Sequence, residues 1–60
     1  MMTKAEIIES LKVWKEKKFY TWNEIAKMLN VSLSTVIYWI SGEVEPSARN
    51  IRKILELIEK

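Results

Sequence analysis

Hydroxyl groups and apolar side chains are mixed in the stretch NVSLSTVIYWISG, which runs from Asn30 to Gly42. On a helix, the side chains pointing outward from this stretch would be Leu33, Ser34, Thr35, Ile37 and Tyr38. A hydroxyl group donates one hydrogen bond and can accept others, and none of these side chains is a ready proton carrier or metal ligand at neutral pH. The chemistry that this stretch offers is therefore binding.

The rest of the sequence carries little catalytic or metal-binding chemistry. The 60 residues include no Cys and no His, and all eight acidic residues are glutamate. Disulfides and the usual zinc sites are excluded by this composition. No pair of carboxylates stands in a pattern that suggests a pocket. We therefore expect no enzyme activity, metal, cofactor or small-molecule ligand.

Length and charge predict one small domain spanning residues 1–60. The formal net charge of +2 permits an anionic partner but does not demand one. No apolar run approaches the roughly 18 residues needed to cross a membrane. The first ten residues, MMTKAEIIES, lack the apolar core of a secretory signal. These features predict a cytoplasmic chain that is not bound to a membrane.

Apolar residues recur at helical spacing, which predicts an all-α domain of four, or at most five, helices. The four helices are expected at about 4–18, 22–29, 32–41 and 47–59. Their predicted N-terminal caps are Thr3, Thr21, Ser32 and Ser47, and the first two have a Glu three residues on, as in a capping box. Asn30 and Gly42 are suited to the left-handed conformation that ends a helix.

The inward faces of these helices supply a predicted core. Its members are Ile7, Leu11, Trp14, Tyr20, Ile25, Ala26, Leu29, Val36, Trp39, Ile40, Ile51, Ile54, Leu55 and Ile58, with Ile8 at its flank and the Tyr20 hydroxyl reaching outward. Since Val36, Trp39 and Ile40 already fill the inner face of the third helix, Leu33, Ile37 and Tyr38 cannot all be buried as well. An exposed apolar patch of this kind indicates an interaction surface.

The two helices at 22–29 and 32–41 have the spacing of a helix-turn-helix. The turn between them contains only the few residues around Asn30. Ala26 is small enough to let the second helix cross the first closely. This arrangement predicts a bihelical unit, but a fold alone does not name a ligand.

The segment TWNEIAKMLNVSLSTVIYWISGEVEPSARNIRKILEL resembles the Cro/repressor-type (Xre-like) helix-turn-helix family of DNA-binding domains. The resemblance rests on the joint spacing of Ala26, Val31, Val36, Trp39, Gly42 and Pro46. It implies sequence-specific binding of double-stranded DNA by a small transcriptional regulator that acts as a repressor. It also implies that residues 32–41 read the major groove. Because a single module of this size offers few contacts, we expect two copies to pair as a homodimer on DNA.

The resemblance assigns roles to particular side chains. Base contacts fall on Leu33, Ser34, Thr35, Ile37 and Tyr38, after the cap Ser32. Phosphate contacts fall on Trp22, Asn23, Ser41 and the connector 43–47, to which Lys17 and Lys18 could add. The last helix, Met1 and Met2 are candidates for the dimer surface. The lysines at 15, 17 and 18 also fit a purely solvated face.

Three departures from the family pattern keep a second hypothesis open. Trp22 stands where many members carry Gln, so its ring could bind phosphate through the indole N–H, contact a protein, or pack against Phe19. Glu43 and Glu45 place carboxylates in a connector that is often basic. Phe19 stands where Gly often follows the first helix. The alternative is a protein-interaction module that keeps the fold without binding DNA.

The apolar patch fits both hypotheses. On DNA, Leu33 and Ile37 could contact thymine methyl groups, while Thr35 or Tyr38 bonds a base edge. On a protein, the same side chains form a docking face. The first hypothesis predicts a major-groove interface with few hydrogen bonds and much apolar contact.

Overall fold

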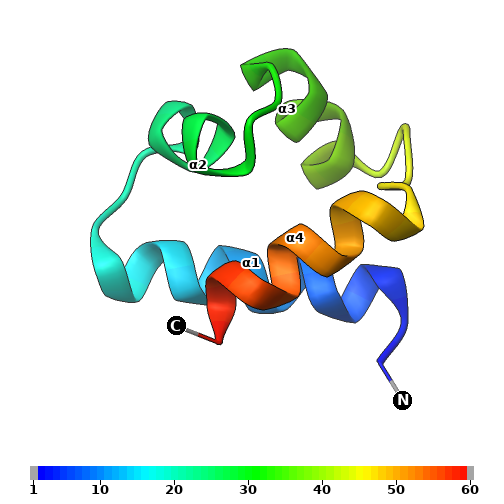
Figure 1. Ribbon diagram of the computed structural model, residues 1–60, viewed down its shortest axis with the longest axis horizontal. Coiled ribbons are helices and arrows are strands. Elements are labelled where there is room, and N and C mark those ends of the chain that lie inside the picture. The colour runs from blue at the N-terminus through cyan, green and yellow to red at the C-terminus, as the bar shows by residue number, and fades with distance from the viewer. Residues whose placement is uncertain (1, 60) are drawn as a thin grey trace.

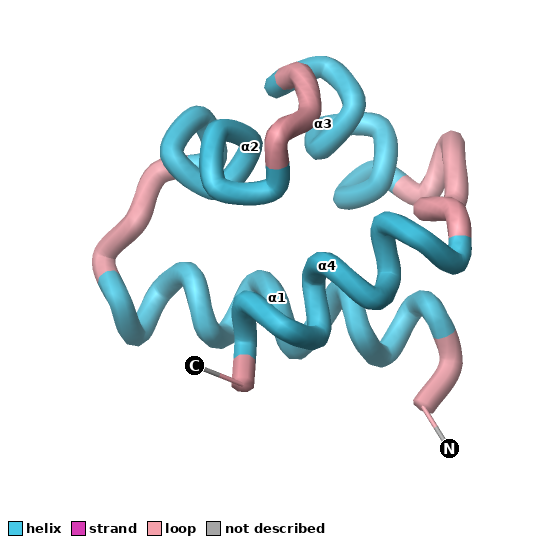
Figure 2. Tube along the Cα trace, in the orientation of Figure 1, coloured by secondary structure: helices cyan, strands magenta, loops and turns pink. Residues whose placement is uncertain are grey.

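The computed structural model describes residues 2–59, and these residues contain four α-helices and no strand (Figures 1 and 2). The helices are α1 (Lys4–Lys18), α2 (Trp22–Leu29), α3 (Leu33–Ser41) and α4 (Ala48–Ile58). The predicted all-α class is confirmed, and every helix end lies within one residue of its predicted place. Ser32 and Ser47 stand just outside α3 and α4 as their caps.

Two capping boxes fix the starts of α1 and α2. The Thr21 hydroxyl accepts a hydrogen bond from the Glu24 backbone N–H at 3.1 Å, and the Glu24 carboxylate accepts one from the Thr21 N–H at 2.8 Å. Thr3 and Glu6 repeat the same pair of bonds. The bond from the Thr backbone N–H stabilises each carboxylate, so the pKa of Glu24 and that of Glu6 lie below the usual 4.5.

The first three helices end at residues with positive φ. Asn30 (φ 59°) and Gly42 (φ 84°) behave as expected, and Phe19 (φ 60°) adopts the same left-handed conformation despite its bulk. The Phe19 N–H donates to the Glu16 carbonyl at 3.3 Å, and the Tyr20 N–H donates to the Lys15 carbonyl at 3.2 Å. These two bonds form a Schellman motif, which satisfies carbonyls that the helix end would leave open.

The helices pack so that α1 lies against α4, while α2 contacts both α3 and α4 (Figure 1). The buried apolar side chains are Ile7, Ile8, Leu11, Ile25, Ala26, Leu29, Val36, Trp39 and Ile54. A hydrogen bond from the Lys53 Nζ to the Leu29 carbonyl, 3.3 Å long, also joins α4 to the end of α2. Together these contacts fix the position of the α2–α3 pair.

The core in the structure is smaller than the predicted core, because several residues at its margin are only partly buried. Six members of the predicted core are only half-buried and pack around the buried cluster: Trp14, Tyr20, Ile40, Ile51, Leu55 and Ile58. Ile8, which was expected only to flank the core, is buried. The Trp14 ring stacks on Tyr20, with ring centroids 5.4 Å apart. Its indole N–H is buried and has no hydrogen-bond partner among the described residues. These side chains lie at the margin because four short helices cannot enclose every apolar position.

No helix within residues 2–59 is long and apolar enough to cross a membrane.

Candidate nucleic-acid interface

The outer face of α3 is exposed because the inner face of this helix is packed against the core. Val36 and Trp39 are buried, and the Val31 N–H donates to the Ala26 carbonyl at 3.0 Å in the turn between α2 and α3. Ala26 itself is buried, as expected for a small residue where two helices cross closely. Since one stripe of α3 is fixed inward, the opposite stripe must face away from the core.

Three apolar side chains occupy that opposite stripe. Leu33 is 42% exposed, Ile37 46% and Tyr38 48%. Together with Ser34 they line a shallow depression of about 220 Å³. The structure thus brings together four of the five side chains that were predicted to contact bases.

Thr35, the fifth predicted base contact, is turned toward the helix cap. Its side chain is half-buried, and its hydroxyl lies 2.8 Å from the Ser32 hydroxyl in a hydrogen bond. The Ser32 hydroxyl also accepts a bond from the Thr35 backbone N–H at 3.1 Å. Ser32 and Thr35 therefore stabilise the start of α3 and do not line the depression.

Ser41 is similarly engaged within the chain at the other end of α3. Its hydroxyl donates to the Tyr38 carbonyl at 3.0 Å and accepts from the Glu43 N–H at 3.4 Å. These bonds connect the end of α3 to the first residue after Gly42. A phosphate contact by Ser41 would have to replace the bond to the Tyr38 carbonyl.

Lys15, in the last turn of α1, contacts the start of α2, and this contact with Trp22 was not predicted from the sequence. The Lys15 Nζ lies 5.1 Å from the centroid of the half-buried Trp22 ring, within the range of a cation–π contact. The suggested packing of Trp22 on Phe19 is wrong, because Phe19 is 91% exposed. Asn23, the next residue of α2, is exposed. Trp22 and Asn23 are thus available at the start of α2, whereas only 18% of the Lys15 side chain is exposed and its Nζ also lies 3.5 Å from the Glu16 carboxylate.

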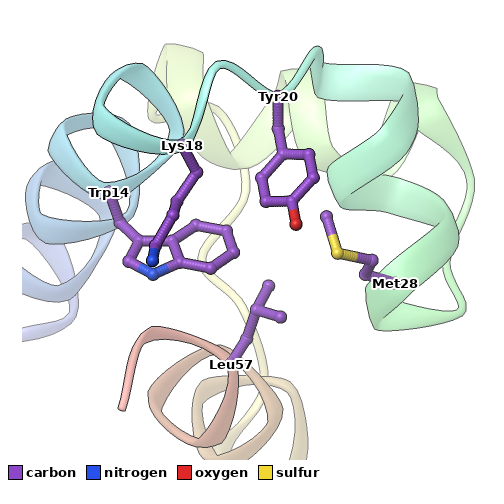
Figure 3. Close-up of a pocket in the computed structure, with 5 residues that line it drawn as sticks. All are labelled: Trp14, Lys18, Tyr20, Met28 and Leu57. Atoms are coloured by element: carbon purple, nitrogen blue, oxygen red, sulfur yellow. The ribbon is translucent and has the colours of Figure 1, made fainter. Parts of the chain in front are cut away.

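Lys17 and Lys18 lie on a different surface from the α3 depression. Lys17 lines a groove of about 350 Å³ with Val13 and Ile58. Lys18 lines a second pocket of about 380 Å³, whose other lining residues are Trp14, Tyr20, Met28 and Leu57. Figure 3 shows Trp14, Lys18 and Tyr20 facing Leu57 and Met28 across this pocket. Neither lining shares a residue with the depression on α3.

The two carboxylates of the connector differ in their surroundings. The Glu45 carboxylate lies 3.8 Å from the Lys4 Nζ at the start of α1. Glu43 forms no ion pair with another described residue. An exposed pair of this kind is weak, but it places a positive charge beside Glu45. Repulsion of a phosphate backbone would therefore come mainly from Glu43.

The fold and the exposed face of α3 define a helix-turn-helix domain. The family profile described as "Helix-turn-helix" matches residues 11–60. The chain belongs to this family, in its Cro/repressor-type (Xre-like) branch, which consists of DNA-binding proteins. Searches of curated proteins and of solved structures found no match to the chain. The residues described above contain no cluster of acidic, His or Cys side chains that could hold a metal ion.

Proposed function

We propose that this chain binds specific sites on double-stranded DNA with α3 in the major groove and regulates transcription inside the cell as a repressor. The observation that carries the proposal is the exposed outer face of α3, held by buried Val36 and Trp39 in a chain of this family. An α-helix with its side chains is about 10–12 Å across, and the major groove is about 12 Å wide. The helix therefore fits the groove with its outer face toward the bases.

The proposed contacts divide into bases and phosphates. Leu33, Ser34, Ile37 and Tyr38 would meet base edges, because they line the depression on α3. Trp22 and Asn23 would meet one phosphate strand, with Lys15 beside them, held between the Trp22 ring and the Glu16 carboxylate. Lys17 and Lys18 would act on DNA only through long-range attraction, which is screened beyond about 8 Å at physiological salt.

We further propose that residues 1–60 act as one unit and pair as a homodimer on DNA. A single small module makes few contacts, and two-fold pairing on half-sites about 34 Å apart would double them. The half-buried Leu57 and Ile58 of α4 and the exposed Met2 support a surface at these elements. The other suggested residue, Met1, lies outside the described residues.

The test is a selection from random duplex oligonucleotides at two salt concentrations, with the oligomeric state measured alongside. We expect an enriched sequence whose affinity falls as salt rises, in proportion to the phosphates neutralised. Protein that binds neither random nor genomic DNA, even at low salt, would contradict the proposal.

A second candidate function is a protein-interaction module. It is favoured by the exposure of Leu33, Ile37 and Tyr38 and by the unpaired position of Glu43 among the described residues. The variant Leu33→Lys with Ile37→Ser separates the two functions. Under DNA binding, the variant changes affinity or sequence preference and leaves solution assembly unchanged. Under protein binding, it abolishes association with a partner or with a second copy.

A further inference from the structure

The helix α3 lacks the side chains that read purines and cytosine most directly. Its sequence, LSTVIYWIS, has no Arg, Lys, Asn, Gln, Asp or Glu. In the major groove, Arg or Lys bonds guanine, Asn or Gln bonds adenine in a bidentate pair, and Asp or Glu accepts from the cytosine amino group. None of these pairings can come from α3, so its selectivity must come from another feature of the base edge.

The side chains that α3 does expose are matched to a methyl group. Leu33 and Ile37 are one helical turn apart, so their side chains are neighbours on the same face. Both line the 220 Å³ depression, together with Ser34 and Tyr38. The C5-methyl group of thymine is the apolar group that a base presents in the major groove. A methyl group entering the depression would lose contact with water and gain contact with these two side chains.

The hydroxyl groups near the depression can bond either kind of group that stands beside the C5 position of a pyrimidine. Ser34 and Tyr38 also line the depression, and each side chain carries a hydroxyl group. A hydroxyl group can donate to the O4 atom of thymine, and it can equally accept from the N4 amino group of a cytosine. Thr35 does not add to these hydroxyl groups, because its own is bonded to Ser32. The hydroxyl groups therefore do not separate the two pyrimidines, and the methyl group is left as the discriminating feature.

We infer that α3 selects DNA by the C5-methyl groups of pyrimidines, so that thymine and 5-methylcytosine are preferred over uracil and cytosine. This inference rests on the proposed binding in the major groove. Burial of one methyl-sized group is worth about a fourfold change in affinity. The affinity for a site with two contacted methyl groups should therefore fall about fifteenfold when both groups are removed.

The test uses the duplex enriched by selection, with each thymine replaced in turn by uracil and each cytosine by 5-methylcytosine. Uracil keeps every hydrogen-bonding group of thymine and lacks only the methyl group. At contacted positions we expect about fourfold weaker binding with uracil, and about fourfold tighter binding where 5-methylcytosine replaces cytosine. Thymine and uracil duplexes bound equally at every position would overturn the inference while leaving DNA binding intact.

Protein variants separate methyl contact from an effect of uracil on the shape of the duplex. The double variant Leu33→Ala with Ile37→Ala should lose the preference for thymine over uracil, and circular dichroism checks that it remains folded. Val13→Ala removes an exposed apolar side chain (54% exposed) from α1 and should keep the preference. A preference that survives in the double variant would overturn the inference.

Two other outcomes have a definite meaning. Absence of binding to all duplexes at low salt would defeat the proposed function itself, and the inference with it. Loss of self-association or of a protein partner in the double variant, without any DNA binding by the native chain, would assign the depression to a protein.

Discussion

Replacing Phe19 by Gly should stabilise the domain. Phe19 holds a left-handed conformation (φ 60°), which costs an L-residue roughly 1–2 kcal/mol. Gly adopts this conformation without steric cost but loses about 0.5–1 kcal/mol more in chain entropy on folding. Phe19 is 91% exposed, so removal of its ring gives up little packing. The net expected gain is about 0.5–1 kcal/mol in the free energy of unfolding.

Thermal unfolding measures this gain, because 1 kcal/mol shifts the Tm of a domain this small by about 4–8 °C. The matched control is Phe19→Ala, which removes the ring but keeps the Cβ atom and should leave the Tm nearly unchanged. Gly42→Ala is the reverse experiment: a Cβ there would meet no atom within 4 Å, yet φ is 84°, so the Tm should fall. If Phe19→Ala raised the Tm as much as Phe19→Gly, the exposed ring and not the backbone would be the cause, and the reasoning would be refuted.

Three further changes test the core, a cap and the connector. Leu11→Ala removes a fully buried side chain and should cost about 2–5 kcal/mol, visible as a large loss of urea resistance or as failure to fold. The hydrogen bond from the Thr21 backbone lowers the pKa of Glu24 and stabilises the fold above pH 4.5. This contribution is lost as the pH falls through the folded-state pKa of Glu24. Urea unfolding at several pH values should show a smaller loss of stability at acid pH for Glu24→Gln than for the native chain. Glu43→Gln should tighten DNA binding by up to about fivefold at low salt, while Glu9→Gln, on α1, should change it less. An unchanged affinity of the Glu43→Gln variant would show that the connector does not lie close to the bound DNA.

Helix ends were predictable because their signals are local. Thr21 and Glu24 stand three residues apart in the sequence, and the structure shows the reciprocal bonds that this spacing predicts. Asn30 and Gly42 adopt the left-handed conformation that their residue types favour. The half-buried state of Trp14 was not predictable in this way. It depends on how much of α1 is covered by α4, and its spacing from Leu11 is that of an ordinary core residue.

The exposed face of α3 was predictable for a related reason. Helical periodicity assigns Val36 and Trp39 to one side, which leaves Leu33 and Ile37 on the other. The contact of Lys15 with Trp22 was missed, because the chain reverses at Phe19 and helical spacing does not extend across that turn. The engagement of the Thr35 hydroxyl with Ser32 was missed as well, since a residue three places after a cap can point to the cap or to solvent.

The central claim is that the outer face of α3 binds double-stranded DNA. Residue-resolved NMR of the 60-residue chain, titrated at low salt with the enriched duplex, tests it most directly. We predict that the largest changes in amide chemical shift fall on Leu33, Ser34, Ile37 and Tyr38, with smaller changes at the start of α2. Changes confined to the pocket around Trp14 and Leu57, or none at saturating DNA, would contradict the claim.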